Sequence, residues 1–222
     1  MTGVEVVRRR STAGEFHALA VPDPATSQVW VHEVTAPALV LGSTQSDDDV
    51  DLAACRRRGV EVVRRRSGGG AVWLVPGEVV WVDVIVPAGG PGWSDDVHVP
   101  MVWLGRHLRR AFAELGVSDV VVHDAPMVRT AASAVVCFDG LAPGELTRGG
   151  AKLVGTSQRR VRHAARLQCC WYVTHDHGDL VELLATPVDV GALRAVATVD
   201  AEVAHALPDA LVRSLRAPDG LD

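Results

Sequence analysis

Cysteine is scarce in this chain, and its four cysteines have no regular spacing: Cys55, Cys137, Cys169 and Cys170. Without paired, closely spaced cysteines, the sequence indicates neither a disulfide scaffold nor a zinc site. We therefore expect free thiols and assign no metal site.

Long apolar runs are also absent. No stretch reaches the roughly 18 uninterrupted apolar residues that a membrane helix needs, and the N-terminus, with Glu5 followed by Arg8, Arg9 and Arg10, lacks the apolar region of a signal peptide. We expect a cytoplasmic protein that does not contact a membrane. The formal net charge of −5 argues against general nucleic-acid binding.

Lysine is the rarest basic residue, because Lys152 is the one lysine among 22 lysine and arginine residues. This bias suggests that Lys152 stands where a compact ammonium is needed and a planar guanidinium does not serve. It lies in the segment Gly-Gly-Ala-Lys-Leu-Val-Gly (149–155), a short apolar strand pattern framed by glycines. The alternative is an exposed lysine left by chance.

The order of the apolar patterns predicts the fold class. The length of 222 residues and the hydrophobic content of 48% fit a single domain spanning residues 1–222. Apolar residues recur at helical spacing over 99–115, whereas a shorter helix is indicated at 47–55 and a helical C-terminal part at 188–206. Strand patterns occur at 60–63, 71–75, 79–86, 117–122, 134–138, 152–154 and 167–173. This order predicts an α+β fold with a mixed, largely antiparallel sheet and packed helices.

A glycine cluster follows a run of arginines: Arg64-Arg65-Arg66-Ser67-Gly68-Gly69-Gly70 lies between two strand patterns. Glycines allow positive φ and present bare N–H groups to an anion, and arginines supply fork-shaped donors for carboxylate or phosphate. The pattern is neither a Walker loop nor a dinucleotide fingerprint, because no Gly-Lys-Ser/Thr follows and the next element is a strand. The alternative is a flexible turn beside solvated arginines.

Three motifs together resemble the lipoate-protein ligase A family, whose catalytic domain is shared with biotin-protein ligases. They are Ala-Leu-Val-Leu-Gly-Ser-Thr-Gln (38–45), Arg-Arg-Arg-Ser-Gly-Gly-Gly-Ala-Val (64–72) and Gly-Ala-Lys-Leu-Val-Gly-Thr-Ser-Gln-Arg-Arg (150–160). They occur in the order of the family and cover about residues 30–173.

The resemblance implies a biotin/lipoate ligase-like fold that activates lipoate or octanoate with ATP, and with Mg²⁺, to an acyl-adenylate. The acyl group then passes to a lysine of a lipoyl acceptor domain, in a 2-oxoacid dehydrogenase or a glycine cleavage protein. Lys152 would bridge the acyl carboxylate and the α-phosphate. The residues implied to bind the acyl group or the adenylate are Arg65, Ser67, Gly68, Gly69, Gly70, Gln45, Asp124 and Gly155.

The chain also departs from the family pattern. Where family ligases usually have His-Asp-x-Gly-Asn after the glycines, this chain has Leu-Val-Pro-Gly-Glu (74–78). The family His-Gly-Ser/Thr is matched by Gln168-Cys169-Cys170, and the family Asn-Asp by His123-Asp124. From the chain length we expect no C-terminal accessory domain of the kind that many full ligases carry.

Two alternatives to an ATP-dependent ligase remain. A related branch, the octanoyltransferases, moves the acyl chain through a cysteine thioester without ATP, and Cys137 near a lysine ammonium would suit a nucleophile. Against this, Cys137 ends the apolar run 134–136 and is typical of a core cysteine, while the triple glycine favours the ligase branch. The third possibility is a non-catalytic lipoyl- or acyl-binding homologue.

Overall fold

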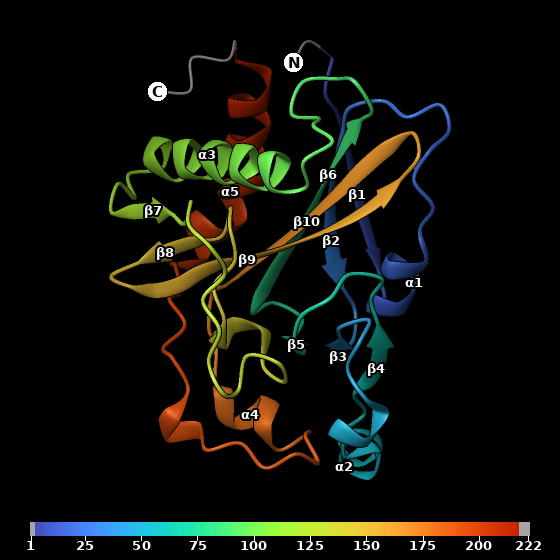
Figure 1. Cartoon of the computed structure of the whole chain (residues 1–222), viewed down its shortest axis with the longest axis vertical. Coiled ribbons are helices and arrows are strands. Elements are labelled where there is room, and N and C mark those ends of the chain that lie inside the picture. Colours follow the sequence, from blue (N-terminus) through green and yellow to red (C-terminus); the bar gives the residue numbers. More distant parts are fainter. Residues whose placement is uncertain (1–2, 218–222) are drawn as a thin grey trace.

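The computed structural model describes residues 3–217 and contains two β-sheets (Figure 1). The large sheet has seven strands in the spatial order β1 (Glu5–Ser11), β2 (Gln28–Val34), β6 (Val79–Pro87), β10 (Ala164–Tyr172), β9 (Ala151–Val161), β8 (Leu146–Arg148) and β7 (Val120–Val122). The small sheet has the order β4 (Glu61–Arg64), β3 (Ala38–Leu41) and β5 (Val72–Leu74).

Most strand pairs are antiparallel, and the two parallel pairs are β1 with β2 and β3 with β4. The expected α+β class with a mixed, largely antiparallel sheet is therefore confirmed. In the centre of the large sheet, Trp81 of β6 lies opposite Cys170 of β10, and Cys170 lies opposite Gly155 of β9. Directly opposed residues project to the same side of a sheet.

The main hydrophobic core lies between the large sheet and the helices α3 (His98–Glu114) and α5 (Ala201–Arg216) (Figure 1). Leu104 and Leu108 of α3 and Leu211 of α5 are fully buried against Val82 and Val84 of β6. The helix expected at 99–115 is thus present and shifted by one residue, because its apolar positions recur at helical spacing.

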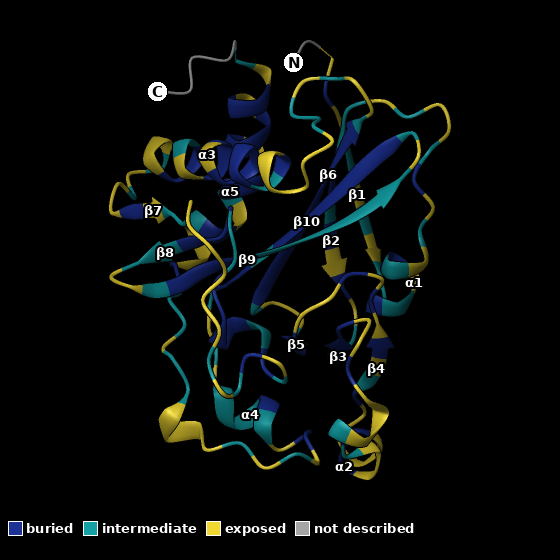
Figure 2. Ribbon diagram, in the orientation of Figure 1, coloured by how far each residue is buried: buried dark blue, intermediate teal, exposed yellow. Residues whose placement is uncertain are grey.

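The opposite side of the large sheet is covered by α1 (Ala13–Ala18) and the small sheet, with α2 (Leu52–Arg57) and α4 (His177–Val181) farther out. Figure 2 shows the central strands as buried and α2 as largely exposed. Thr12 and Glu15 form a capping box at the start of α1, which fixes the beginning of this short helix. No helix within residues 3–217 combines the length and apolar character needed to span a membrane.

Two expected elements were wrong. The apolar run 134–138 is not a strand, because Val136 makes only an isolated bridge to Ala71 and the chain then turns into a 3₁₀ helix at Cys137–Asp139. The helical part expected at 188–206 is reduced to a 3₁₀ turn at Val190–Ala192 and the start of α5 at Ala201, because the chain between them is extended, with Val196 bridging to Lys152.

The other differences concern extent. The helix expected at 47–55 is split into a 3₁₀ turn at Asp47–Asp49 and α2, because Val50 between them is extended and bridges Leu184. The strand expected at 152–154 is part of the much longer β9, and β8 lies where no strand pattern was predicted. Tertiary pairing decides such boundaries more than local propensity does.

Candidate active site

A mostly apolar pocket, partly open to solvent, lies between the two sheets. Its walls come from both sheets, from Arg65 before the glycine turn and from the segment with Cys137 and Phe138. The residues that line it are His17, Val40, Arg65, Val72, Leu74, Trp81, Cys137, Phe138, Gly155, Thr156, Ser157, Gln168, Cys169 and Cys170. Apolar lining with a few polar groups is typical of small-molecule sites.

Lys152 on β9 is buried, with 6% of its surface exposed, and lies beside this pocket. Its Nζ is 2.7 Å from Glu145 Oε2 and donates to the carbonyl oxygens of Cys137 and Gly140, each at 3.1 Å. An ammonium group has three N–H donors, so these contacts occupy all of them. Burial, the largest single cause, would lower the pKa of Lys152, but the opposing electrostatic interactions, of which that with the Glu145 carboxylate is the largest, together raise the pKa above its ordinary value.

Glu145 completes this buried ion pair and was not predicted as the partner of Lys152. Its Oε2 also accepts from the backbone N–H of Ala142 at 2.8 Å, and its Oε1 accepts from that of Thr156 at 2.9 Å. The ion pair therefore ties the loop before β8 to β9. A single glutamate in a loop carries no sequence signal for such a role.

Cys137 begins the 3₁₀ turn and is only half-buried. Its sulfur lies in the pocket wall, 3.9 Å from Arg65 Nη2. Its carbonyl oxygen is held by Lys152. Cys137 is thus partly exposed and packs at the edge of a hydrophobic core, whereas its apolar neighbours indicated a core cysteine.

Arg65 is buried and holds the glycine turn from within. Its Nη2 donates to the carbonyl oxygens of Gly68 and Gly70 at 2.9 and 2.8 Å, and its Nη1 donates to that of Val40 at 3.2 Å. The flanking Arg66 is exposed. The guanidinium therefore organises the backbone next to Cys137 and also presents positive charge to the sulfur.

The glycines permit close approach of the two segments. A Cβ on Gly70 would lie 2.7 Å from the backbone nitrogen of Cys137, and one on Gly155 would lie 2.8 Å from the ring of Phe138. A Cβ on Gly42 would meet the carbonyl oxygen of Gly69 at 1.8 Å. The glycine turn and Lys152 thus converge on Cys137, as two cooperating motifs should.

The other residues singled out in the sequence have different surroundings. Gln45 accepts from the Gly42 N–H at 2.9 Å and donates to the Val135 carbonyl at 3.2 Å, so it braces backbone. Ser67 is buried, and its hydroxyl has no hydrogen-bond partner among residues 3–217. Asp124 lies at the surface beside Arg106, and it is not among the residues that line the pocket.

Cysteine chemistry distinguishes the four thiols. Burial is the largest cause that raises the pKa of Cys55, Cys169 and Cys170. It raises the pKa of Cys170 to about 12. These three side chains stay protonated at neutral pH and are poor nucleophiles. Cys137 is the cysteine whose sulfur faces both the pocket and a guanidinium.

Comparison with solved structures confirms the fold. Lipoate-protein ligase A bound with ATP superposes with a TM-score of 0.69 at 15% identity, covering 95% of this chain and 83% of that chain. A bipartite lipoate protein ligase from Thermoplasma acidophilum, described with its E2 lipoyl domain, gives a TM-score of 0.68 at 15% identity, covering 98% and 86%.

The curated relatives are octanoyltransferases. Octanoyltransferase LipM of Moorella thermoacetica is 29% identical over 162 residues, which are 72% of this chain and 59% of the relative. Octanoyltransferase LipM of Carboxydothermus hydrogenoformans is 31% identical over 127 residues, which are 57% of this chain and 45% of the relative. The chain thus spans about half the length of these relatives.

The family model of the lipoyl protein ligase A/B catalytic domain matches residues 16–217. This match includes the glycine turn, Cys137 and Lys152. It also includes every strand of the two sheets apart from β1. The chain therefore belongs to the lipoyl protein ligase A/B catalytic domain family.

Proposed function

We propose that the chain is an octanoyltransferase that carries the acyl group as a thioester on Cys137 and delivers it to a lysine of a lipoyl acceptor domain. The position of Cys137 carries this proposal, because its sulfur lies in the wall of an apolar pocket and 3.9 Å from Arg65 Nη2. The octanoyltransferase relatives at 29–31% identity support the same choice.

In the first step, the Cys137 thiolate attacks the carbonyl carbon of an octanoyl thioester donor. A new carbon–sulfur bond forms to Cys137, the bond to the donor sulfur breaks, and the donor leaves as a thiol after taking the proton that the Cys137 thiol had released. Negative charge develops at the reacting centre during this exchange. The Arg65 guanidinium lies 3.9 Å from the sulfur, and preplaced positive charge near the reacting centre stabilises the transition state.

In the second step, a neutral lysine amine of the acceptor attacks the Cys137 thioester. An amide bond forms, the carbon–sulfur bond breaks, and the amine proton balances the released thiolate. Cys137 returns to its starting state. The covalent intermediate thus divides the overall transfer into two steps.

Lys152 is a positioning residue in this mechanism. Its donors hold the carbonyl oxygens of Cys137 and Gly140, which lie at either end of the 3₁₀ turn. The ammonium is itself fixed by the buried Glu145. The turn that carries the nucleophile is therefore anchored to β9.

The residues present do not fit the alternative of ATP activation with Mg²⁺. In an ATP-dependent ligase, Lys152 would contact the α-phosphate. Here its three N–H donors are occupied by protein oxygens. The position of the family histidine that follows the glycines holds Leu74, which is buried in the small sheet. No step above uses ATP.

The test is covalent trapping without ATP. The protein is incubated with S-octanoyl-N-acetylcysteamine, and intact-protein and peptide mass spectrometry should find one octanoyl group on Cys137 that hydroxylamine removes. Cys137→Ala should form no adduct. Cys55→Ala is the matched control, since this buried cysteine is not among the residues that line the pocket and its loss should leave the adduct unchanged.

The trapped enzyme should then acylate an isolated lipoyl domain. Transfer by Cys137→Ala that proceeds at the wild-type rate, with ATP and octanoate, would refute the thioester mechanism and support the ligase. Binding of octanoate without any transfer would support the non-catalytic homologue.

A further inference from the structure

The pocket crosses the strands of the large sheet and has two distinct ends. Trp81, Cys170 and Gly155 form one row across β6, β10 and β9. Neighbouring strands lie about 4.8 Å apart, so the row is about 10 Å long. This length is comparable to that of an extended octanoyl chain.

Cys137 belongs to the β9 end of this row. The ring of the next residue, Phe138, lies so close to Gly155 that a Cβ there would be 2.8 Å from it. The small-sheet residues Val40, Val72 and Leu74 line the pocket from the other side. An acyl chain attached to the Cys137 sulfur therefore has apolar walls along the row toward β6.

The β6 end is closed by two aromatic side chains. His17 of α1 and Trp81 both line the pocket, and their ring centroids are 4.7 Å apart. Burial, which is the largest cause, lowers the pKa of His17 to about 3, and the nearby Arg166 acts in the same direction. The imidazole is thus neutral at physiological pH and is compatible with the end of an apolar chain.

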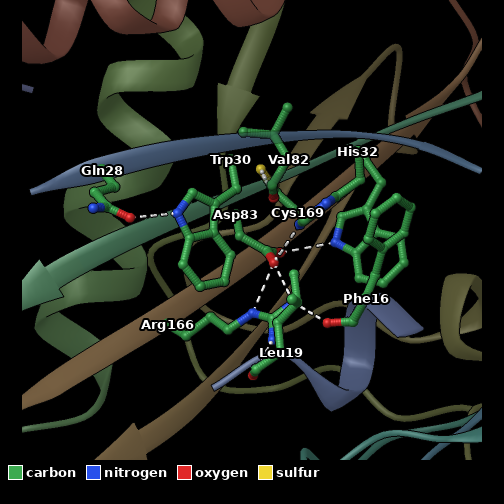
Figure 3. Close-up of polar contacts among 10 residues, drawn as sticks. Phe16, Leu19, Gln28, Trp30, His32, Val82, Asp83, Arg166 and Cys169 are labelled. Carbon is green, nitrogen blue, oxygen red and sulfur yellow. Dashed lines mark hydrogen bonds and ion pairs between the residues drawn. The ribbon is translucent and has the colours of Figure 1, made fainter. Parts of the chain in front are cut away.

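A buried polar cluster holds this end in place (Figure 3). Arg166 donates to Asp83 and to the carbonyl oxygens of Phe16 and Leu19, which flank His17 in the chain and lie at the end of α1. Asp83 in turn accepts from the indole N–H of Trp81 at 2.8 Å. One carboxylate–guanidinium pair therefore fixes both members of the aromatic wall relative to the sheet.

Building on the proposed acyl transfer, we infer that His17 and Trp81 form the end wall that sets the length of the acyl chain, with His17 as the specificity-determining residue and Arg166 as the residue that positions it. The wall stands two strand spacings from the row position next to Cys137. Chains longer than octanoyl would have to displace the imidazole.

The test compares acyl lengths in one mixture. Hexanoyl, octanoyl, decanoyl and dodecanoyl thioesters of N-acetylcysteamine compete for Cys137, and the adducts are counted by intact-protein mass spectrometry. His17→Ala should raise the decanoyl-to-octanoyl ratio about 10-fold or more, because one or two methylenes in a hydrophobic pocket discriminate by that order. His17→Phe keeps a ring of similar size and should retain the octanoyl preference.

The matched control is His205→Ala, an exposed histidine on α5 that should leave the profile unchanged. An unchanged ratio in His17→Ala would overturn the inference. Thermal unfolding identifies a variant that fails to fold, and His17→Leu then takes the place of His17→Ala, with a shift intermediate between those of alanine and phenylalanine expected.

Calorimetric binding of the free C6 to C12 fatty acids separates this inference from the proposed function. If no thioester reacts at Cys137 but His17→Ala still moves the tightest-binding acid from C8 to C10 or C12, the transferase mechanism fails and the end wall stands. If Cys137 reacts and His17→Ala leaves the chain-length preference unchanged in both assays, the end-wall inference is wrong and the transferase mechanism is retained.

Discussion

The Lys152 ammonium lies 3.1 Å from the carbonyl oxygen of Cys137. Together with Gly140 and Glu145, this contact places three acceptors around a single nitrogen atom. A planar guanidinium cannot direct its donors to three oxygens around one point, which gives a physical reason for a lysine in a chain that otherwise uses arginine.

Replacing Lys152 should destabilise the protein as well as slow acyl transfer. Lys152→Met leaves Glu145 buried without its partner, which typically costs about 3–5 kcal/mol. The double variant Lys152→Met/Glu145→Gln removes both charges and should recover much of that loss, while acylation of Cys137 stays slow because its carbonyl has lost a donor. Urea unfolding and the rate of adduct formation measure the two effects; Lys152→Arg with native values of both would contradict the assignment.

The glycine turn offers a matched pair of substitutions. Gly70→Ala would place a methyl group 2.7 Å from the backbone of Val136 and Cys137, whereas Gly68→Ala meets nothing within 4 Å. Overpacking of this kind typically costs about 1–3 kcal/mol, and it should displace Cys137 and reduce its acylation. Gly68→Ala should behave like the wild type in thermal unfolding and in adduct formation. Equal behaviour of the two variants would argue against the close packing of the turn on Cys137.

Acid should weaken the fold through two half-buried neutral histidines. Burial lowers the pKa of His17 to about 3 and that of His175 to about 4, from an ordinary value of 6.5. Between these values the unfolded chain binds more protons than the folded one, so stability is fully present above pH 6.5 and falls as the pH drops toward 3. His17→Phe should flatten this decline. Urea titrations at pH 7.5, 6, 5 and 4 measure the free energy of unfolding. If it falls with pH equally in the wild type and in His17→Phe, His17 does not contribute to the loss of stability in acid.

The buried pair of Asp83 and Arg166 should be sensitive to removal of one charge. Arg166 lowers the pKa of Asp83 against the opposing effect of complete burial, which is the largest single cause. Arg166→Met leaves the buried Asp83 carboxylate without its guanidinium, with His32 and Trp81 as its remaining partners, and we expect a loss of about 3–5 kcal/mol. Arg166→Met/Asp83→Asn should be closer to the wild type in urea unfolding. A single variant as stable as the double one would show that Asp83 does not depend on Arg166.

The sequence determined a good deal by itself. Apolar spacing located α3, because a helix that packs on a sheet must repeat its apolar face, and the runs at 79–86 and 167–173 located β6 and β10. Composition identified Lys152, and the clustering of glycines identified the turn at 68–70. Both features can be recognised from the sequence because they depend on single residues or on short segments. The family resemblance came from the same motifs and is confirmed by the family match.

Only the tertiary structure decided which side chains these motifs place together in the pocket. The run 134–138 has the local pattern of a strand, but its contacts with the glycine turn make it a loop that places the Cys137 sulfur in a pocket. Glu145 and His17 have no local signal, because their roles depend on strand register and on an ion pair between distant segments. Burial and the distances between side chains arise only when the two sheets close on one another, and they place the lone lysine against the Cys137 carbonyl oxygen, the contact on which its proposed anchoring role rests.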